Sequence, residues 1–244
     1  MSAVFRITLN RPEKRNALDR QLILDIRARL TEAAALAEAR VVLISGAGKD
    51  FCAGADLSEL RRIRDSSILE NYADARILME LFLEMRRHPL PVIAAVRGRA
   101  LAGGCGLATA SDIVLASDNA QFGYPEVRIG FVPAMVMAIL RRNVSEKLAF
   151  ELLAAGKLLN AAEALAAGFV NAVYADASFE SAVETYAAEL AGRSASAVRL
   201  TKRLLYHMDA MPFDAALEAG AQINAIARMT DDCRQGIDRF LNKE

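Results

Sequence analysis

Short apolar runs alternate with stretches of helical periodicity over most of the chain. Residues 18–39 repeat apolar side chains at helical spacing, with Asp19 suited to cap the first turn, and residues 68–87 predict a second long helix. The apolar runs, which are typical of buried strands, fall at residues 4–9, 41–45, 92–96, 113–116 and near 169–173. Buried strands that alternate with helices predict an α/β fold with a parallel sheet.

The last part of the chain follows a different pattern. From residue 134 onward it is mostly helical, and residues 196–242 predict helices only. These alanine-rich helices predict a layer that is separate from the sheet. We therefore expect a core of residues 1–190 and a C-terminal helical region of residues 191–244.

Composition narrows the class of protein. Hydrophobic residues make up 54% of the 244 residues, which excludes a disordered chain, and the three cysteines lack the spacing of a disulfide framework. The 30 basic and 30 acidic residues balance, so the charge gives no support for nucleic-acid binding. No apolar run could span a membrane, and no export signal precedes the first strand. We expect a cytoplasmic protein without a membrane or nucleic-acid partner and, given only two histidines and no CxxC pair, without a metal.

A loop of small residues, 50–57, follows the second predicted strand. Its glycine and alanines let a ligand approach the backbone closely. Asp56 stands where a helix would begin, so the amides near Ala55 would point outward and suit an anion or an oxyanion. A tight turn with Asp56 as a helix cap explains the same residues, and both interpretations stay open at this point.

A second glycine-rich loop, residues 98–106, also lies between an apolar strand and a helix. It lacks the Lys-Ser or Lys-Thr of a phosphate loop and the GxGxxG of a dinucleotide site. Its glycines predict either close packing of helix on strand or a second set of amide donors. Two such loops in one chain favour a paired oxyanion hole, in which each donor typically lowers the barrier by ~2.7–4 kcal/mol.

A third stretch, residues 122–133, places a single carboxylate, Glu126, among apolar residues, glycines and prolines. Apolar surroundings raise the pKa of a carboxyl group, which suits general acid–base catalysis. A salt bridge to Arg128 or a helix cap is the alternative role for Glu126. Residues that would line an acyl pocket, or else belong to the core, are Leu60, Leu101, Tyr124, Ile129 and Phe131.

These loops, in this order, make the chain resemble the crotonase superfamily, also called the enoyl-CoA hydratase/isomerase family. The matching segments are LNRPEKRNAL (9–18), FCAGADL (51–57), GRALAGGCG (98–106), FGYPEVRIGFVP (122–133) and AAEALAAGFV (161–170). The resemblance covers essentially the whole chain. It implies a crotonase-like α/β fold of repeated ββα units with a C-terminal α-helical trimerisation region, and hence a homotrimer or a hexamer built as a dimer of trimers.

The same resemblance implies an acyl-CoA thioester as substrate, with coenzyme A as part of that substrate and no separate cofactor. Two backbone amides, which match Ala55 and Gly103, would stabilise an enolate at the thioester oxygen. The backbone of Ala53 would meet the adenine of coenzyme A, and Arg15 would approach its phosphates. The other positions expected to contact substrate are Ala17, Gly54, Asp56, Leu57, Leu101, Gly106, Pro125 and Ile129.

The chain departs from the family at one catalytic position. Typical hydratases of the family use two glutamates, of which one matches Glu126 and the other matches Gly106. Because glycine cannot hold or activate water, three functions stay open. The first is hydration of a 2-enoyl-CoA, with Glu126 as acid–base and the water held by other groups. The second is an enoyl-CoA isomerase, for which one glutamate suffices, and the third is a catalytically weak acyl-CoA-binding protein. Hydration is the function we expect.

Overall fold

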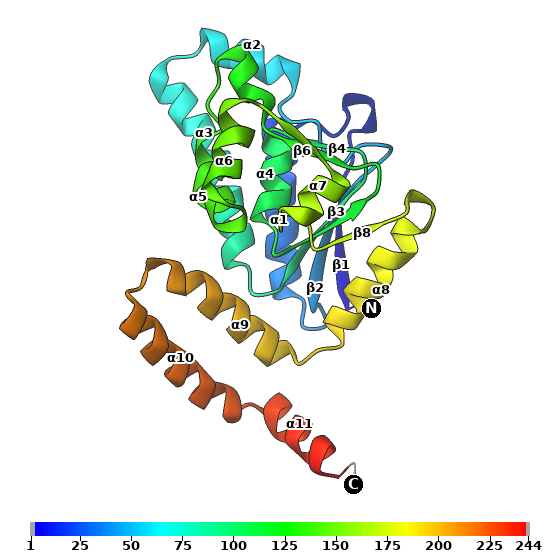
Figure 1. Ribbon diagram of the computed structural model, residues 1–244, viewed down its shortest axis with the longest axis vertical. Coiled ribbons are helices and arrows are strands. Elements are labelled where there is room, and N and C mark those ends of the chain that lie inside the picture. Colours follow the sequence, from blue (N-terminus) through cyan, green and yellow to red (C-terminus); the bar gives the residue numbers. More distant parts are fainter. Residues whose placement is uncertain (1–2, 243–244) are drawn as a thin grey trace.

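Five parallel strands form the main sheet of the computed structural model, which describes residues 3–242 apart from the side chain of Leu57 (Figure 1). In sheet order the strands are β1 (Val4–Leu9), β2 (Val41–Gly46), β3 (Val92–Val96), β5 (Ile113–Ser117) and β8 (Ala172–Tyr174). Every neighbouring pair in this order is parallel. The predicted α/β fold with a parallel sheet is confirmed.

Helices cover both faces of this sheet, because successive strand side chains point to opposite sides. Ile44 and its neighbours on one face pack against α1 (Arg20–Ala35) and α3 (Ile68–Arg87). Leu43 and its neighbours on the other face pack against α8 (Phe179–Ala191). Since both faces are buried, the strands are continuous apolar runs, without the alternation of a half-exposed sheet.

A second, three-stranded sheet lies beside the glycine-rich loops. It consists of β4 (Arg99–Leu101), β6 (Gln121–Gly123) and β7 (Leu158–Asn160), with β4 parallel to β6 and β6 antiparallel to β7. None of the three was predicted, because three residues are too short to show a period. The predicted loop 98–106 therefore contains a strand and the first turn of α4 (Gly103–Ala110).

The predicted helix caps are correct, whereas some boundaries differ. The carboxylate of Asp19 accepts a hydrogen bond from the amide of Leu22 at 2.8 Å, and α1 ends at Ala35, short of the predicted residue 39, because Leu36 is extended. The last strand of the main sheet starts at residue 172, later than predicted. The remaining elements near the loops are α2 (Leu57–Asp65), α5 (Ala134–Asn143), α6 (Glu146–Ala154), α7 (Ala161–Ala166) and the 3₁₀ turns Pro12–Lys14 and Pro125–Ile129.

The C-terminal helices leave the sheet and extend away from it (Figure 1). They are α9 (Ala195–His207), α10 (Phe213–Arg228) and α11 (Asp231–Leu241), so the predicted helical end of the chain is confirmed. Lys202 ties α9 to the core, since its buried Nζ pairs with Asp112 at 2.7 Å. The division at residue 190 stays a prediction. None of the helices in the described part is long and apolar enough to cross a membrane.

Candidate active site

A cavity of about 580 Å³ opens between α2, α3, the start of α4 and the turn Pro125–Ile129. The expected site residues that line it come from all three loops: Ala53, Ala55, Gly103, Gly106, Pro125, Glu126 and Ile129. Leu60 and Phe131, expected in an acyl pocket, also line it. The structure therefore brings the two expected amide donors and the candidate acid–base residue together in one cavity.

The other residues expected to contact substrate do not line this cavity. Arg15 is exposed, with its Nε 3.9 Å from a carboxylate oxygen of Asp50. Asp56 is buried and bonded to protein groups. The residues Ala17, Gly54 and Leu101 also do not line the cavity. The side chain of Leu57 lies outside the described part of the chain. Contact of these residues with substrate stays a prediction.

Tyr124 belongs to the core, which was the alternative to a pocket wall. Its side chain is buried behind the cavity, where its hydroxyl shares a short hydrogen bond with Thr109. The thiols of Cys52 and Cys105 are buried as well, and burial raises the pKa of each to about 12. Such thiols stay protonated at neutral pH, so both cysteines act as packed core residues and not as nucleophiles.

The amide of Ala55 has no acceptor among the described residues. Leu18 pairs with Ala55 as in a parallel ladder: the Leu18 amide donates to the Gly54 carbonyl at 2.6 Å, and the Asp56 amide donates to the Leu18 carbonyl at 2.9 Å. In such a pairing the residue between the two bonds turns its own N–H away from the partner strand. The N–H of Ala55, which lines the cavity, is thereby left available to a ligand.

The amide of Gly103 is the second available donor. Gly103 is the first residue of α4, where an amide has no partner within the helix, and no acceptor for it occurs in the described structure. The preceding residue, Ala102, has φ 49° and ψ −125°, a conformation that costs about 1–3 kcal/mol in a residue other than glycine. A hydrogen bond from the Ala102 amide to the Gly123 carbonyl, at 2.9 Å, helps to hold this bend.

The two glycine-rich loops pack directly on each other. A methyl group added to Gly54, which has φ 103°, would lie 2.9 Å from the Cβ of Ala102, and one added to Gly104 would lie 2.3 Å from the Cys52 carbonyl oxygen. Close backbone packing and amide donation were alternative explanations of these glycines. The close packing occurs in the structure, and it holds the two unpaired amides in the lining of the cavity; donation to a ligand stays a prediction.

Glu126 brings a carboxyl group to the same cavity from the third loop. It lies in the 3₁₀ turn Pro125–Ile129, and its Oε2 is buried without a hydrogen-bond partner in the described structure. Burial raises its pKa above the usual 4.5. Arg128 does not form the salt bridge that was the alternative; its guanidinium instead donates to the Gly156 carbonyl at 2.8 Å. A half-buried carboxyl without an ion partner is suited to accept and return a proton.

Phe82 fills the space beside Gly106. A methyl group added to Gly106 would lie 2.6 Å from Cζ of the Phe82 ring, and Phe82 also lines the cavity. A longer side chain at position 106 therefore requires the ring to move. Glycine at this position and the phenyl ring from α3 form one packed unit in place of a second carboxylate.

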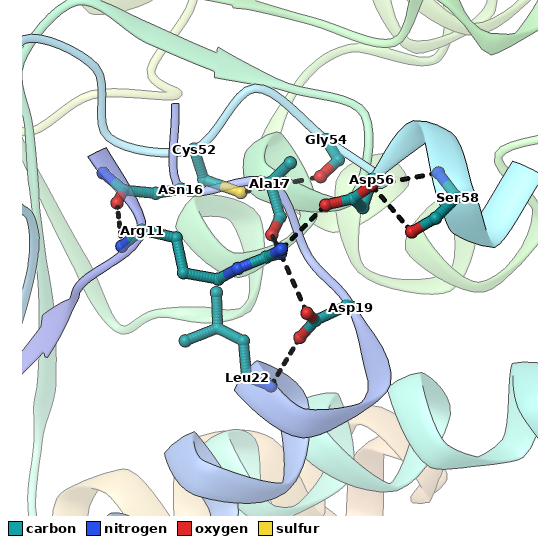
Figure 2. Close-up of polar contacts among 9 residues, drawn as sticks. All are labelled: Arg11, Asn16, Ala17, Asp19, Leu22, Cys52, Gly54, Asp56 and Ser58. Atoms are coloured by element: carbon teal, nitrogen blue, oxygen red, sulfur yellow. Dashed lines mark hydrogen bonds and ion pairs between the residues drawn. The ribbon is translucent and has the colours of Figure 1, made fainter. Parts of the chain in front are cut away.

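Arg11 links the first loop of the site to its neighbours, as Figure 2 shows. Its guanidinium donates to the Ala17 carbonyl at 2.6 Å and pairs with Asp19 at 3.0 Å and with Asp56 at 2.8 Å. Hydrogen bonds from Ser58 to the carboxylate of Asp56, together with Arg11, lower the pKa of Asp56 to about 2. Sequence reasoning missed Arg11, because an arginine before a proline indicates only a turn.

Polar residues of α2 and α3 were also missed. Glu59, Asn71 and Asp74 line the cavity, and Arg62 pairs with both Glu59 and Asp74. Only the spacing of charges on two predicted helix faces could have indicated them. No cluster of three or more histidine, cysteine or acidic side chains that could hold a metal occurs in the part of the chain that the structure describes.

Comparison with known proteins gives consistent results. The family model described as enoyl-CoA hydratase/isomerase matches residues 1–244. A Thermus thermophilus protein named "Putative enoyl-CoA hydratase" is 40% identical over 237 residues, which cover 97% of this chain and 94% of that protein. The 2,3-dehydroadipyl-CoA hydratase of Escherichia coli is 34% identical over 242 residues, covering 98% of this chain and 92% of the relative.

Solved structures agree over the same length. An enoyl-CoA hydratase from Polaromonas sp. JS666 superposes with a TM-score of 0.95 at 29% identity, covering 100% of this chain and 95% of the other. An enoyl-CoA hydratase from Mycobacterium smegmatis gives a TM-score of 0.94 at 30% identity, covering 99% of this chain and 93% of the other.

Proposed function

The chain belongs to the enoyl-CoA hydratase/isomerase family, and from that premise we propose that it hydrates a 2-enoyl-CoA thioester through an enolate. Family membership confirms the resemblance drawn from the motifs and the crotonase-like fold class. The chain is therefore an enzyme of the hydratase or isomerase type. The substrate, the mechanism and the site residues below belong to the proposal.

One observation carries the proposal: two unpaired amides, of Ala55 and Gly103, and the unpaired carboxyl of Glu126 line the same cavity. In the proposed reaction the thioester oxygen accepts hydrogen bonds from the two amides. Water adds its oxygen to C3 while the electrons of the double bond pass toward the thioester oxygen. Rigid donors aimed at that oxygen stabilise the developing charge without having to reorganise.

Glu126 handles the protons in this scheme. Its carboxylate takes a proton from the attacking water and gives a proton to C2, so that one molecule of water adds across the double bond. Burial supports this role, because a raised pKa brings the carboxyl closer to neutral pH, where it serves both as base and as acid. Since Gly106 cannot hold the water, the proposal assigns that task to other groups of the cavity.

Contacts with coenzyme A complete the proposal. Ala53 lines the same cavity, and its backbone would meet the adenine. Arg15, which is exposed on the neighbouring loop, would approach the phosphates. The homotrimer or dimer of trimers stays part of the proposal, supported by large apolar side chains exposed on α10, on α11 and in the turn between them: Phe213, Leu217, Ile226, Met229, Ile237 and Phe240. A cytoplasmic location stays a proposal as well.

Isomerisation of the double bond is the second candidate, and a specific observation favours it. The Phe82 ring occupies the space beside Gly106 where a second carboxylate would stand. Moving a double bond needs one base that shuttles a proton between two carbons, and Glu126 alone supplies it. The names of the relatives favour hydration, which is why we place hydration first. Acyl-CoA binding with weak catalysis is the third candidate.

The test uses purified protein and a short trans-2-enoyl-CoA, followed by the absorbance of the conjugated thioester. Loss of the absorbance, with a product heavier by one water, is the expected result. A flat trace would contradict hydration. Conversion of a 3-enoyl-CoA into the conjugated thioester would then assign isomerisation, and binding of both thioesters without turnover would assign the binding function.

A further inference from the structure

The side chain of Arg11 bridges two other segments of the site (Figure 2). Nη1 contacts the Ala17 carbonyl at 2.6 Å and the carboxylate of Asp19 at 3.0 Å, while Nη2 contacts the carboxylate of Asp56 at 2.8 Å. The first two partners lie just before α1 and the third lies just before α2. One planar guanidinium thus joins the starts of two helices.

Ala55 lies between the groups that Arg11 holds. Its neighbours in the chain are bonded to Leu18, through the Gly54 carbonyl and the Asp56 amide. On one side of this ladder Arg11 bonds Ala17, which precedes Leu18, and on the other it bonds Asp56, which follows Ala55. The orientation of the Ala55 peptide therefore depends on a frame that Arg11 closes.

We propose that Arg11 is a positioning residue, which aims the Ala55 amide at the thioester oxygen by clamping Asp56 to the Ala17–Asp19 segment. The inference rests on the proposed function of the Ala55 amide as an oxyanion donor. Arg11 does not line the cavity and touches no reacting atom, so it acts only through the backbone that it holds. A displacement of about 1 Å in such a group costs roughly 10²-fold in rate.

The clamp needs an arginine rather than a positive charge alone. The planar fork of a guanidinium reaches a carbonyl and two carboxylates at fixed angles, whereas an ammonium is a point charge on a flexible stem. Asp56 is only 3% exposed, so loss of its cation leaves a buried carboxylate that keeps just its two bonds to Ser58. Arg11→Lys should therefore restore the charge but not the geometry.

The test compares Arg11→Met and Arg11→Lys with Arg27→Met in the full-length protein. Arg27 is the matched control, because its side chain is 24% exposed, as is that of Arg11, and because it also pairs with two carboxylates, Glu80 and Glu84. Its partners lie on α3, away from the ladder of Ala55. Thermal unfolding reports stability, and steady-state kinetics separate kcat from KM.

A second readout measures the hydrogen bonds to the thioester oxygen without turnover. The probe is an enoyl-CoA thioester conjugated with a dialkylaminophenyl ring, whose absorbance moves to longer wavelength when the thioester oxygen accepts strong hydrogen bonds. We expect Arg11→Met to lose most of this red shift and to lower kcat by about 10²-fold, with KM changing less than about threefold. Arg27→Met should keep the red shift even where its loss of thermal stability equals that of Arg11→Met.

An unchanged red shift in Arg11→Met, or an equal loss in Arg27→Met, would overturn the positioning role. If Arg11→Met does not fold, Asp56→Asn takes its place: asparagine caps a helix as well as aspartate does, but it removes the ion pair with Arg11. That variant should lose part of the red shift, and a full red shift would contradict the inference. Wild-type protein that shows the red shift but converts neither enoyl-CoA would overturn the proposed function alone, and the variants would still decide the role of Arg11.

Discussion

The wall of the cavity that carries the amide donors is packed from behind, whereas much of the wall that carries Glu126 is open. On the donor wall, an added methyl group at Gly54 or Gly104 would meet backbone or Cβ atoms within 3 Å. Beside Glu126, the lining side chains of Ile129 and Val132 are 64% and 65% exposed, and a methyl group added to Gly130, between them in the chain, would meet nothing within 4 Å.

The carboxyl groups of the two walls also differ, in how firmly each is held in its charged form. Asp56, behind the donors, is held charged by Ser58 and Arg11, which lower its pKa to about 2. Glu126 has no ion partner in the described structure, and burial raises its pKa. The donor wall is thus fixed by packing and ion pairs, whereas the wall with Glu126 carries a group that can change its protonation. In the proposed reaction, enolate stabilisation would therefore depend on the fold, while the step that follows would depend on few side chains.

Glu126→Gln should have the largest effect on this contrast. The amide cannot accept and return a proton, so we expect turnover to fall by ~10²–10⁴-fold, the usual contribution of a general acid–base group. The donor wall is untouched, so the affinity for an acyl-CoA and the thermal stability should stay close to those of wild type. Steady-state kinetics and a thermal unfolding scan measure both.

Glu59→Gln is the matched control for this variant, since Glu59 is another glutamate that lines the cavity but pairs with Arg62 at 2.7 Å. Its loss of turnover should be much smaller. Equal losses in the two variants, or wild-type rates in Glu126→Gln, would show that Glu126 is not the acid–base residue.

Sequence reasoning was more successful for the backbone amides and Glu126 than for the side chains that pack around the donor loops. The helix cap Asp56 and the outward amides near Ala55 were predictable, because strand-to-helix loops of small residues place amides at helix starts, whereas Gly103 was identified through the family resemblance. The role of Arg11 was not predictable, since Asp56, far away in the sequence, is brought to it only by the tertiary fold. Likewise, nothing local to Gly106 indicates that the ring of Phe82 lies above it.

A carboxylate introduced at position 106 should sharpen the contrast further. Gly106→Glu alone overpacks the Phe82 ring and should lower the free energy of unfolding by ~1–3 kcal/mol. With Phe82→Leu added, we expect stability to recover in part. We also expect the rate of hydration to rise about tenfold above wild type. This gain is smaller than the ~10²–10⁴-fold that a well-oriented general acid–base group contributes. Absorbance assays at saturating 2-enoyl-CoA measure the gain in the rate of hydration.

The matching control is Phe82→Leu alone, which enlarges the cavity without adding a carboxyl group. A stable double variant that hydrates no faster than this control would show that other groups already hold the water. It would also weaken the case for isomerisation, which rests on the missing second carboxylate.

The smallest expected effect is on the pH dependence of stability, and it has opposite signs for the two walls. The stability that Asp56 contributes is complete above its ordinary pKa of 3.8 and is lost as pH falls toward about 2, because the folded pKa is the lower one. The raised pKa of Glu126 means that the folded state favours the protonated form, so stability falls as pH rises through 4.5. Denaturant unfolding at a series of pH values measures the free energy of unfolding. Compared with wild type, Asp56→Asn should lose less of this free energy as pH falls below 3.8. Glu126→Gln should lose less of it as pH rises above 4.5. The same slope in both variants would mean that the two carboxyl groups share one environment, contrary to the division between a fixed wall and a titrating one.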